Sequence, residues 1–306
     1  MGETTVVRLG GYQGARSVHT RAARIVEREF LQRAGENYRF DFCEDVTALG
    51  RPSIDLFSMV EGDELDLSYF ASSYLAHRVP DLAIFDLPFQ ITSRDEIYPR
   101  LDGALGRYLA EAIEKNTGFV LLGYWDNGFR HFSNRVRPIC RPEDCEGLSI
   151  RTMNSEVHQA TFRALGFDPR FIDIKDFRAA VRAGAVDAQE NPLTNTVNFK
   201  IHETHPFVTM TGHFYGVTLV LGNRARIEGW PEPTRVALGD AVAVATRSQR
   251  RFAAEEDDEC LKILARAGVE VINGDFDAGA FIEATQEVVA RESAAIDPRV
   301  TTLMRG

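Results

Sequence analysis

The chain has 306 residues, enough for one large domain or two domains of ordinary size. Hydrophobic residues make up 44% of it and charged residues 26%, a composition typical of a globular protein with a sizeable core. The formal net charge is −10, which argues against nucleic acids and anionic membranes as partners. An acidic ligand would need a local basic pocket to overcome this overall charge.

The sequence shows neither a membrane-spanning segment nor an export signal. No apolar run approaches the roughly 20 residues that cross a bilayer. The longest apolar runs, residues 119–125 and 217–222, have the length of a strand. The start, MGETTVVRL, has no basic n-region and no apolar h-region, so no signal peptide is expected in this sequence.

Strand-like and helix-like runs alternate from the start of the chain. In order, the patterns predict a strand at residues 6–11, a helix at 17–35, a strand at 39–46, a short helix at 53–63 and a strand at 65–70. Alternation of this kind predicts parallel strands joined by crossover helices, and therefore an α/β fold.

The middle of the chain continues the alternation. The spacing of Ser93 and Glu96 predicts a capping box at the start of a helix that runs to about Lys115, and a strand follows at 119–125. The next predicted elements are a strand, a helix, a strand, a helix and a strand at residues 147–155, 155–166, 168–174, 175–184 and 185–192.

A long helical stretch follows, from about Pro233 to Ala267, with Gly239 as its one internal glycine. Its length of roughly 50 Å, at about 1.5 Å per residue, exceeds one small domain, so this helix is expected to lie across two. A strand at 269–274 and a helix near 276–291 complete the prediction.

Residues 58–70 and 179–191 share one plan: a helix, a glycine, a short link, an aspartate and a strand. This weak internal similarity suggests that the two halves of the chain are built alike. Two similar α/β domains that face each other form a cleft, and ligands in open α/β sheets lie at the carboxyl ends of the strands.

One predicted strand ends in an unusual run of polar residues. The stretch AVDAQENP places Asp187, Gln189, Glu190 and Asn191 directly before Pro192. These side chains would lie at the carboxyl end of the strand, where a ligand is expected. Asn191 is suited to donate an amide hydrogen to a ligand carboxylate, and Glu190 is expected to form an ion pair behind it.

Common enzyme motifs are missing: the sequence has no GxSxG, GxxxxGK[ST] or GxGxxG. In HETH, only two residues separate His202 from His205, which favours two solvated histidines over a metal site of the HExxH type. No cofactor and no metal are therefore expected. Catalytic groups can assemble from distant segments, so an enzyme is disfavoured but stays open.

The four cysteines are Cys43, Cys140, Cys145 and Cys260, without a CxxC pair. Cys140 and Cys145 are five residues apart across a proline-containing loop, close enough to form a disulfide in an oxidising compartment. The sequence favours four free thiols and leaves this one bridge open.

Two arginines lie beside apolar strands. Arg151 closes the run GLSIR, and Arg130 lies in DNGFRHFSN. The guanidinium group is planar, stays charged and donates two parallel hydrogen bonds, so it is suited to carboxylates. A surface salt bridge is the usual role of an arginine, but an arginine at the end of an apolar strand is equally suited to a ligand.

These segments, in their order along the chain, resemble the solute-binding proteins of TRAP transporters, the DctP family. The resemblance is carried by NGFRHFSN, GLSIRTMNS, AVDAQENP and MTGHFYGVTLVLGN, with FDLPF and RAGAVDAQENPLTN in addition. It covers nearly the whole chain.

The resemblance implies a two-domain periplasmic binding protein fold, type II-like, with a hinge of crossing strands and a long helix spanning both α/β domains. Domain I would comprise residues 1–125 and about 213–252, and domain II about 126–212 and 253–306. It also implies a monomer in the periplasm, whose signal peptide has been removed and which delivers its ligand to a sodium-driven permease. A periplasmic location would favour the disulfide.

The resemblance also implies roles for single residues. Arg151 matches the main carboxylate-binding arginine of the family, and Arg130 matches a second arginine of the cleft. Asn191 matches the asparagine that meets the ligand carboxylate, and Asn154 matches another pocket-lining position. In SYFASSYL, some relatives that bind sialic acid carry a glutamate and an arginine where this chain has Ser72 and Leu75, which argues against sialic acid.

Further candidates for the pocket are residues with polar or aromatic side chains at predicted strand ends and loops. They are Tyr12, Gln13, His19, Ser72, Ser73, Trp125, Asn127, Asp173, His213 and Tyr215. Each has an alternative: Asp173 is suited to cap the next helix, His19 fits one face of the first helix, and Trp125 and Tyr215 fit a core.

Hydroxyl and amide groups dominate this set, which favours a polyhydroxylated acid such as a uronate or aldonate. An aromatic acid and a C4-dicarboxylate held by two arginines are the alternatives. Two other classes stay open: an enzyme on a binding-protein scaffold, with His131 or His213 as base, and a sensor subunit that signals to a membrane kinase.

Overall fold

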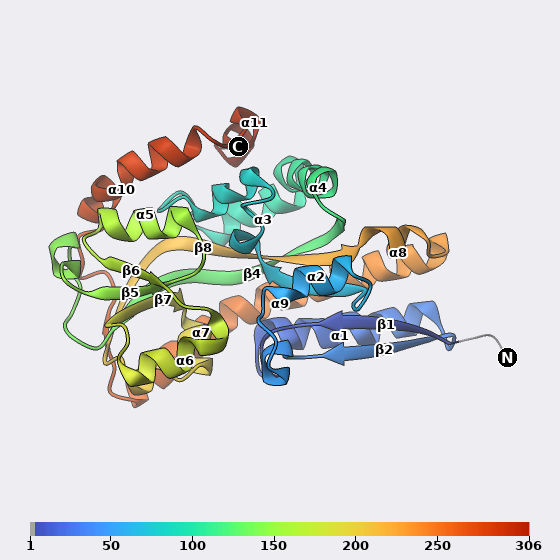
Figure 1. Cartoon of the computed structure of the whole chain (residues 1–306), viewed down its shortest axis with the longest axis horizontal. Helices are drawn as coiled ribbons and strands as arrows, with labels where there is room; N and C mark the ends of the chain where they lie inside the picture. The colour runs from blue at the N-terminus through green and yellow to red at the C-terminus, as the bar shows by residue number, and fades with distance from the viewer. Residues whose placement is uncertain (1–3, 306) are drawn as a thin grey trace. The chain divides into compact units, whose positions relative to one another are not determined.

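The computed structural model describes residues 4–305; residues 1–3, on which part of the signal-peptide prediction falls, and Gly306 lie outside this range. The chain forms two compact units (Figure 1). Unit 1 comprises the chain up to Ala71 together with Tyr108–Asp126 and Val217–Ala253, and unit 2 comprises Ser72–Arg107, Asn127–Gly216 and the chain from Ala254 onward. Across residues 4–305, no helix has both the length and the apolar character needed to cross a bilayer.

Unit 1 is built around three parallel strands. The strands β1 and β2 pair in parallel, and β1 also pairs with β3. The antiparallel partner of β3 is the last part of β8, where Leu67 lies opposite Gly222. Their bounds are β1 Thr5–Gly10, β2 Tyr38–Cys43, β3 Leu67–Ala71 and β8 Phe207–Asn223.

The first helix of unit 1 begins and ends close to the residues that the sequence predicts, whereas η1 and α8 were not predicted. In α1, the Ser17 hydroxyl accepts a hydrogen bond from the amide of His19 at 3.1 Å, and Gly35 ends the helix. The other bounds are α1 Val18–Ala34, η1 Val46–Leu49, α2 Asp55–Glu61 and α8 Arg224–Glu228.

Unit 2 has a second group of parallel strands, in which β5 pairs with both β6 and β7. The strand β7 pairs on its other side with β4, antiparallel, so that Phe132 lies opposite Glu190. The short strand β9 pairs with the first part of β8. Their bounds are β4 Phe119–Asn134, β5 Ser149–Thr152, β6 Asp168–Phe171, β7 Ala188–Pro192 and β9 Glu270–Ile272.

Helices lie on both faces of the strands β5, β6 and β7, with α5 and α10 on one face and α6 and α7 on the other (Figure 1). The bounds of the helices in unit 2 are η2 Ser72–Tyr74, η3 Pro80–Asp86, α3 Arg94–Asp102, η4 Pro142–Cys145, α5 Glu156–Ala164, α6 Ile174–Ala183, α7 Leu193–Asn198, η5 Ile201–Glu203, α10 Ala278–Ser293 and α11 Pro298–Arg305.

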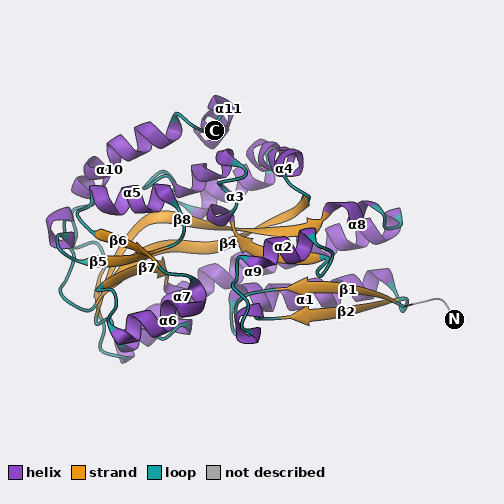
Figure 2. Cartoon of the chain, in the orientation of Figure 1, coloured by secondary structure: helices purple, strands orange, loops and turns teal. Residues whose placement is uncertain are grey.

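Four elements pass from one unit to the other. They are the long strands β4 and β8 (Figure 2) and the helices α4 (Ala104–Asn116) and α9 (Glu232–Arg266). The long helix predicted from the sequence is confirmed as α9. The predicted α/β class with shared strands is confirmed as well, although β4 and β8 run antiparallel to their neighbours β7 and β3, whereas the alternation of the sequence predicted parallel strands.

The unit boundaries differ from the expected domains in one segment. Residues 72–107 belong to unit 2, whereas the sequence assigned them to the first domain. The reason is that their side chains bond within unit 2: His158 contacts Asp86 at 3.1 Å, and the Asp297 amide donates to Asp81 at 2.9 Å.

Two local predictions need correction. The helix expected from Ser93 to Lys115 is broken at Gly103 into α3 and α4, because the backbone of Gly103 leaves the helical region, with φ −105° and ψ −141°. The segment NGFRHFSN is the continuation of β4, which runs unbroken from Phe119 to Asn134.

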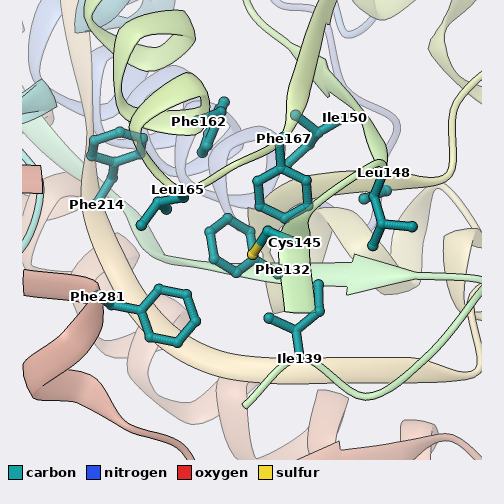
Figure 3. Close-up of a cluster of buried hydrophobic side chains, with 11 residues drawn as sticks. Phe132, Ile139, Cys145, Leu148, Ile150, Phe162, Leu165, Phe167, Phe214 and Phe281 are labelled. Atoms are coloured by element: carbon teal, nitrogen blue, oxygen red, sulfur yellow. The ribbon is translucent and has the colours of Figure 1, made fainter. Parts of the chain in front are cut away.

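The core of unit 2 is a cluster of aromatic and aliphatic side chains on one face of its strands (Figure 3). Phe132 of β4 lies at its centre, with Phe162 of α5 and Phe281 of α10 around it. Cys145 is fully buried in the same cluster, and all four cysteines are free thiols, so the bridge between Cys140 and Cys145 is not formed.

Gly184 ends α6 in the left-handed region, at φ 70°, and its amide bonds to the carbonyls of Ala180 and Val181. We expect Gly184→Ala to destabilise the protein by about 1–2 kcal/mol, because a side chain is strained in this region. Gly239 is the matched control: it lies inside α9, and an added Cβ meets nothing within 4 Å. Gly239→Ala should therefore stabilise the protein by up to about 1 kcal/mol. Urea unfolding midpoints check both, and equal shifts in the same direction would contradict the assignment.

Candidate functional site

Unit 2 places charged and amide side chains together at the end of β7. All five residues of this strand are buried, and among them Gln189 and Glu190 have no exposed surface. The polar stretch of the sequence therefore lies inside the protein, where each polar group needs a partner.

The carboxylate of Glu190 is held by the guanidinium of Arg130. Arg130 Nη2 donates to Glu190 Oε1 at 2.7 Å, and Nε donates to Oε2, so the pair has the two-pronged geometry that arginine favours. Arg130 Nη2 also donates to the carbonyl of Glu190 at 3.0 Å. Burial alone would raise the pKa of Glu190, but Arg130, His158 and His213 together hold it well below its usual value, so this carboxylate is charged.

Two histidines flank the same carboxylate. His158 Nδ1 lies 3.8 Å from Glu190 Oε1, and His213 Nε2 lies 3.5 Å from Oε2. Burial lowers the pKa of His213 to about 4, so its ring is neutral. Burial also disfavours the charged form of His158, but Asp86 and Glu190 outweigh this effect and raise its pKa.

Arg151 is buried like Arg130, with 1% of its surface exposed, but no carboxylate within residues 4–305 is paired with it in the way that Glu190 is paired with Arg130. Its Nε donates to the carbonyl of Ile172 at 2.9 Å, and its guanidinium lies 4.7 Å from the centre of the Phe177 ring. Its Nη2 is buried and has no hydrogen-bond partner among the described residues. Burial lowers the pKa of Arg151, with Tyr74 and Glu190 acting in the opposite direction. The group still stays protonated, because a guanidinium is not deprotonated in proteins.

The charges in this region do not balance. Its charged side chains are Arg130, Arg151, His158, Asp86 and Glu190, while His213 and Tyr74 beside them are neutral. With His158 protonated, three positive charges stand against two negative ones. The bidentate pair uses Arg130 and Glu190, and His158 contacts Asp86, so Arg151 carries the surplus positive charge. A buried cation with an unused donor is a binding position for an anion.

The amide of Asn191 is oriented by its neighbours. Its Nδ2 donates to Gln189 Oε1 at 2.6 Å, and its Oδ1 accepts from Arg130 Nη2 and from Asn195 Nδ2, each at 3.3 Å. Gln189 is itself fixed by Ser133, whose hydroxyl lies 2.5 Å from Gln189 Nε2. The Nδ2 group carries a second hydrogen that can be donated to a ligand.

The other residues predicted for unit 2 have varied positions. Ser73 donates to Asp86 Oδ1 at 2.5 Å, and Ser72, beside it in η2, is buried. Asp173 caps α6 by accepting from the Lys175 amide at 2.9 Å, which is its alternative role. Asn154 follows β5 and is exposed.

Two further predicted residues lie on β8. Tyr215 is buried and forms a T-shaped contact with Phe129, with 5.0 Å between the ring centres. His213 Nδ1 lies 2.7 Å from the hydroxyl of Thr211, and the His213 ring stacks on Phe132. These two contacts fix the ring that faces Glu190.

His19 and Gln13 belong to unit 1. The amide oxygen of Gln13 lies 3.1 Å from His19 Nδ1, and His19 stacks with Tyr69 at 5.6 Å between ring centres. Burial lowers the pKa of His19 to about 3, so it is neutral. Gln13 Nε2 and His19 Nε2 are buried without a hydrogen-bond partner in the part of the chain that the structure describes.

The sequence did not predict the roles of His158, Asp86, Tyr74 and Phe177. His158 is an inward position of α5, and Asp86 is the aspartate of FDLPF, but 72 residues separate them. A contact between such distant residues leaves no local pattern. Within residues 4–305, no three His, Cys, Asp or Glu side chains are grouped to hold a metal ion.

Comparisons with known proteins find relatives that match most of this chain. The model of the family described as bacterial extracellular solute-binding protein, family 7 (DctP), matches residues 32–295. The 2,3-diketo-L-gulonate-binding periplasmic protein YiaO of Escherichia coli is 31% identical over 75% of this chain and 69% of that protein. A protein of Haemophilus influenzae is 31% identical over 71% of this chain and 66% of its own length, slightly under two thirds.

Solved structures share the fold. The sugar acid binding protein DctPAm of Advenella mimigardefordensis, in complex with galactonate, has a TM-score of 0.93 and 22% identity, covering 99% of this chain and 97% of that one. A TRAP periplasmic solute-binding protein of Sulfurospirillum deleyianum with bound succinate has a TM-score of 0.91 and 23% identity, covering 100% of this chain and 99% of that one.

Proposed function

This chain belongs to the DctP family of TRAP-transporter solute-binding proteins, receptors for organic acids, and on this premise we propose that its preferred ligand is a sugar acid, a uronate or an aldonate. In this proposal, the receptor works in the periplasm as a monomer and delivers the bound anion to a sodium-coupled membrane permease. Arg151 holds the carboxylate of the ligand, with Asn191 beside it.

The observation that carries the proposal is the buried guanidinium of Arg151. Its Nη2 has no hydrogen-bond partner among the described residues, and it supplies the surplus positive charge of the region. Arg130, in contrast, already forms a bidentate pair with Glu190. A ligand carboxylate therefore supplies both the counter-charge and the acceptor that Arg151 lacks.

The same contrast favours one carboxylate over two. A C4-dicarboxylate held by both arginines would need Arg130 to give up part of its pair with Glu190, which is fully buried. A sugar acid needs one cation and several hydrogen-bonding groups for its hydroxyls. Asp86 Oδ2 is a buried acceptor without a partner among the described residues, and Ser73 lies beside it. The predicted contacts His19, Gln13, Ser72, Asn154, Asp173, His213 and Tyr215 stay part of the proposal.

YiaO, at 31% identity, is named for a sugar acid, which supports this ligand class. The alternatives are an aromatic acid and a C4-dicarboxylate. Catalysis is the less favoured class: burial lowers the pKa of His131 to about 3 and that of His213 to about 4, so both histidines are weak bases. A sensor role would use the same binding site, and a membrane kinase instead of a permease would be its partner.

A thermal-shift screen tests the proposal. The purified protein is heated with D-glucuronate, D-galactonate, succinate and benzoate in separate samples, after unfolding and refolding to remove any co-purified ligand. A ligand that binds only the folded protein raises the melting temperature, and we expect the shift with the two sugar acids. A larger shift with succinate or benzoate would overturn the ligand class, and no shift with any acid would overturn the assigned site.

A further inference from the structure

His158 is a buried side chain that the proposed contacts to the ligand do not use. It lies on α5 with no exposed surface, between two carboxylates from different parts of unit 2. Its Nε2 is 3.1 Å from Asp86 Oδ1, and its Nδ1 is 3.8 Å from Glu190 Oε1. The 3.8 Å contact is longer than a hydrogen bond, so His158 and Glu190 attract each other as opposite charges, and only when the ring is protonated.

The aromatic neighbours of His158 suit a cation as well. Its ring stacks on Phe214 of β8 at 4.1 Å between ring centres, with the planes 19° apart, and it forms a T-shaped contact with Phe162. Both phenylalanines belong to the core cluster of unit 2 (Figure 3). The ring is therefore fixed in position, and a positive charge on it faces the π-electrons of Phe214.

The charged and titratable groups around His158 come from four elements. Asp86 of η3 and Glu190 of β7 are the two carboxylates. His213 of β8 lies on the other oxygen of Glu190, and its pKa, lowered to about 4, makes it neutral. Arg130 of β4 is paired with Glu190. Of the two histidines in this group, His158 is the one whose pKa is raised, by Asp86 and Glu190, from its ordinary value of 6.5.

We propose that His158 is a positioning residue: its proton holds Glu190 and Asp86 in place behind the arginines and makes the affinity for a carboxylate ligand fall as that proton is lost. The inference rests on the proposed function, because it names the regulation of the same site. His158 lies between two contacts: Arg130 forms a bidentate pair with Glu190, and Ser73 donates a hydrogen bond to Asp86.

The direction follows from the charges. With His158 protonated, the region carries one surplus positive charge, and a ligand monoanion neutralises it. Without this proton, the two arginines are balanced by Asp86 and Glu190, and the ligand adds an uncompensated negative charge inside the protein. Asp86 and Glu190 raise the pKa of His158 above its ordinary value of 6.5 despite the opposing effect of burial. Affinity is thus full below about pH 6.5 and falls as pH rises through the raised value.

Calorimetric titration of the refolded protein with D-galactonate tests this inference, from about pH 6 to about pH 9, where a sugar-acid carboxylate is always ionised. We expect the wild-type affinity to fall about tenfold across this range, which is the effect of one pKa unit of linkage. His158→Gln keeps hydrogen bonding but has no proton to lose, so it should bind more weakly at pH 6 and show a flat profile. The matched control is His202→Gln, a half-buried histidine whose Nδ1 lies 3.4 Å from the Thr196 carbonyl, and it should keep the wild-type profile.

A measurement of histidine protonation in the wild type keeps the inference testable even if His158→Gln does not fold. The protein has seven histidines, and nitrogen-15 NMR of the ring nitrogens reports the protonation of each in the wild type. One buried ring should titrate above 6.5 in the ligand-free protein and keep its proton to higher pH when D-galactonate is bound. If the wild type binds D-galactonate with a profile as flat as that of His158→Gln, or if the ring of His158 is neutral at pH 6, the inference is wrong. If the wild type binds none of the screened acids, the proposed function fails instead.

Discussion

Arg151→Ala is expected to weaken binding of the preferred acid at least about 100-fold, which corresponds to roughly 2.7 kcal/mol. Each charge-assisted hydrogen bond contributes about 1.5–3 kcal/mol, and removing one member of a buried ion pair costs about 3–5 kcal/mol. The ligand carboxylate would lose its main partner, because Arg130 is occupied by Glu190. Calorimetry with the acid that gives the largest thermal shift measures the change.

Folding and binding can be separated at this position. In the ligand-free protein, Arg151 is a buried cation with an unused donor, so its removal should leave the melting temperature unchanged or higher. Arg151→Met, which keeps a long side chain against Phe177, is the matched variant. Arg178→Ala, at an exposed position of α6, should leave the affinity unchanged. Near-wild-type affinity in both Arg151 variants would remove this residue from the site.

Glu190→Gln is expected to lower the free energy of unfolding of the ligand-free protein by about 3–5 kcal/mol. The substitution keeps the shape of the side chain but leaves the buried cation of Arg130 without its counter-charge, and it removes one of the two carboxylates around His158. Urea unfolding gives the change. The exposed ion pair of Glu203 with Arg182 provides a control, since Glu203→Gln should have no measurable effect.

A double variant tests the physical reason. Removing both charges, with Arg130→Met and Glu190→Leu, should restore part of the stability lost in Glu190→Gln, because apolar residues of similar size can replace a buried ion pair. The melting temperatures of the single and double variants, compared without ligand, decide this. A double variant less stable than Glu190→Gln would show that the pair itself, and not an unpaired charge, dominates the energetics.

Much of the fold could be predicted because local patterns determine it. Ser17 begins α1 and Gly35 ends it, and Gly184 ends α6, all where their conformational preferences place them. The polar run before Pro192 was recognisable for a similar reason: buried strands are apolar, so Gln189, Glu190 and Asn191 had to have a special role.

The parts that escaped prediction depend on contacts between distant residues. Asp86 and His158 meet across 72 residues, and Arg130 and Glu190 across 60. The placement of residues 72–107 in unit 2 follows from such contacts, not from the composition of the segment. The break at Gly103 was missed because a single glycine inside an apolar helical pattern does not show whether the backbone continues through it.

The interleaved order of the two units has a consequence for synthesis of the protein. β3 pairs with the end of β8, so Leu67 can pair only after Gly222 has been synthesised. Unit 1 is complete only when the chain has been made as far as Ala253. By then, unit 2 lacks only the residues from Ala254 onward. A nascent chain stopped before residue 217 would expose the edge of β3, and an unpaired strand edge promotes aggregation. The two units thus reach completion late and almost together, and neither is available as a continuous fragment.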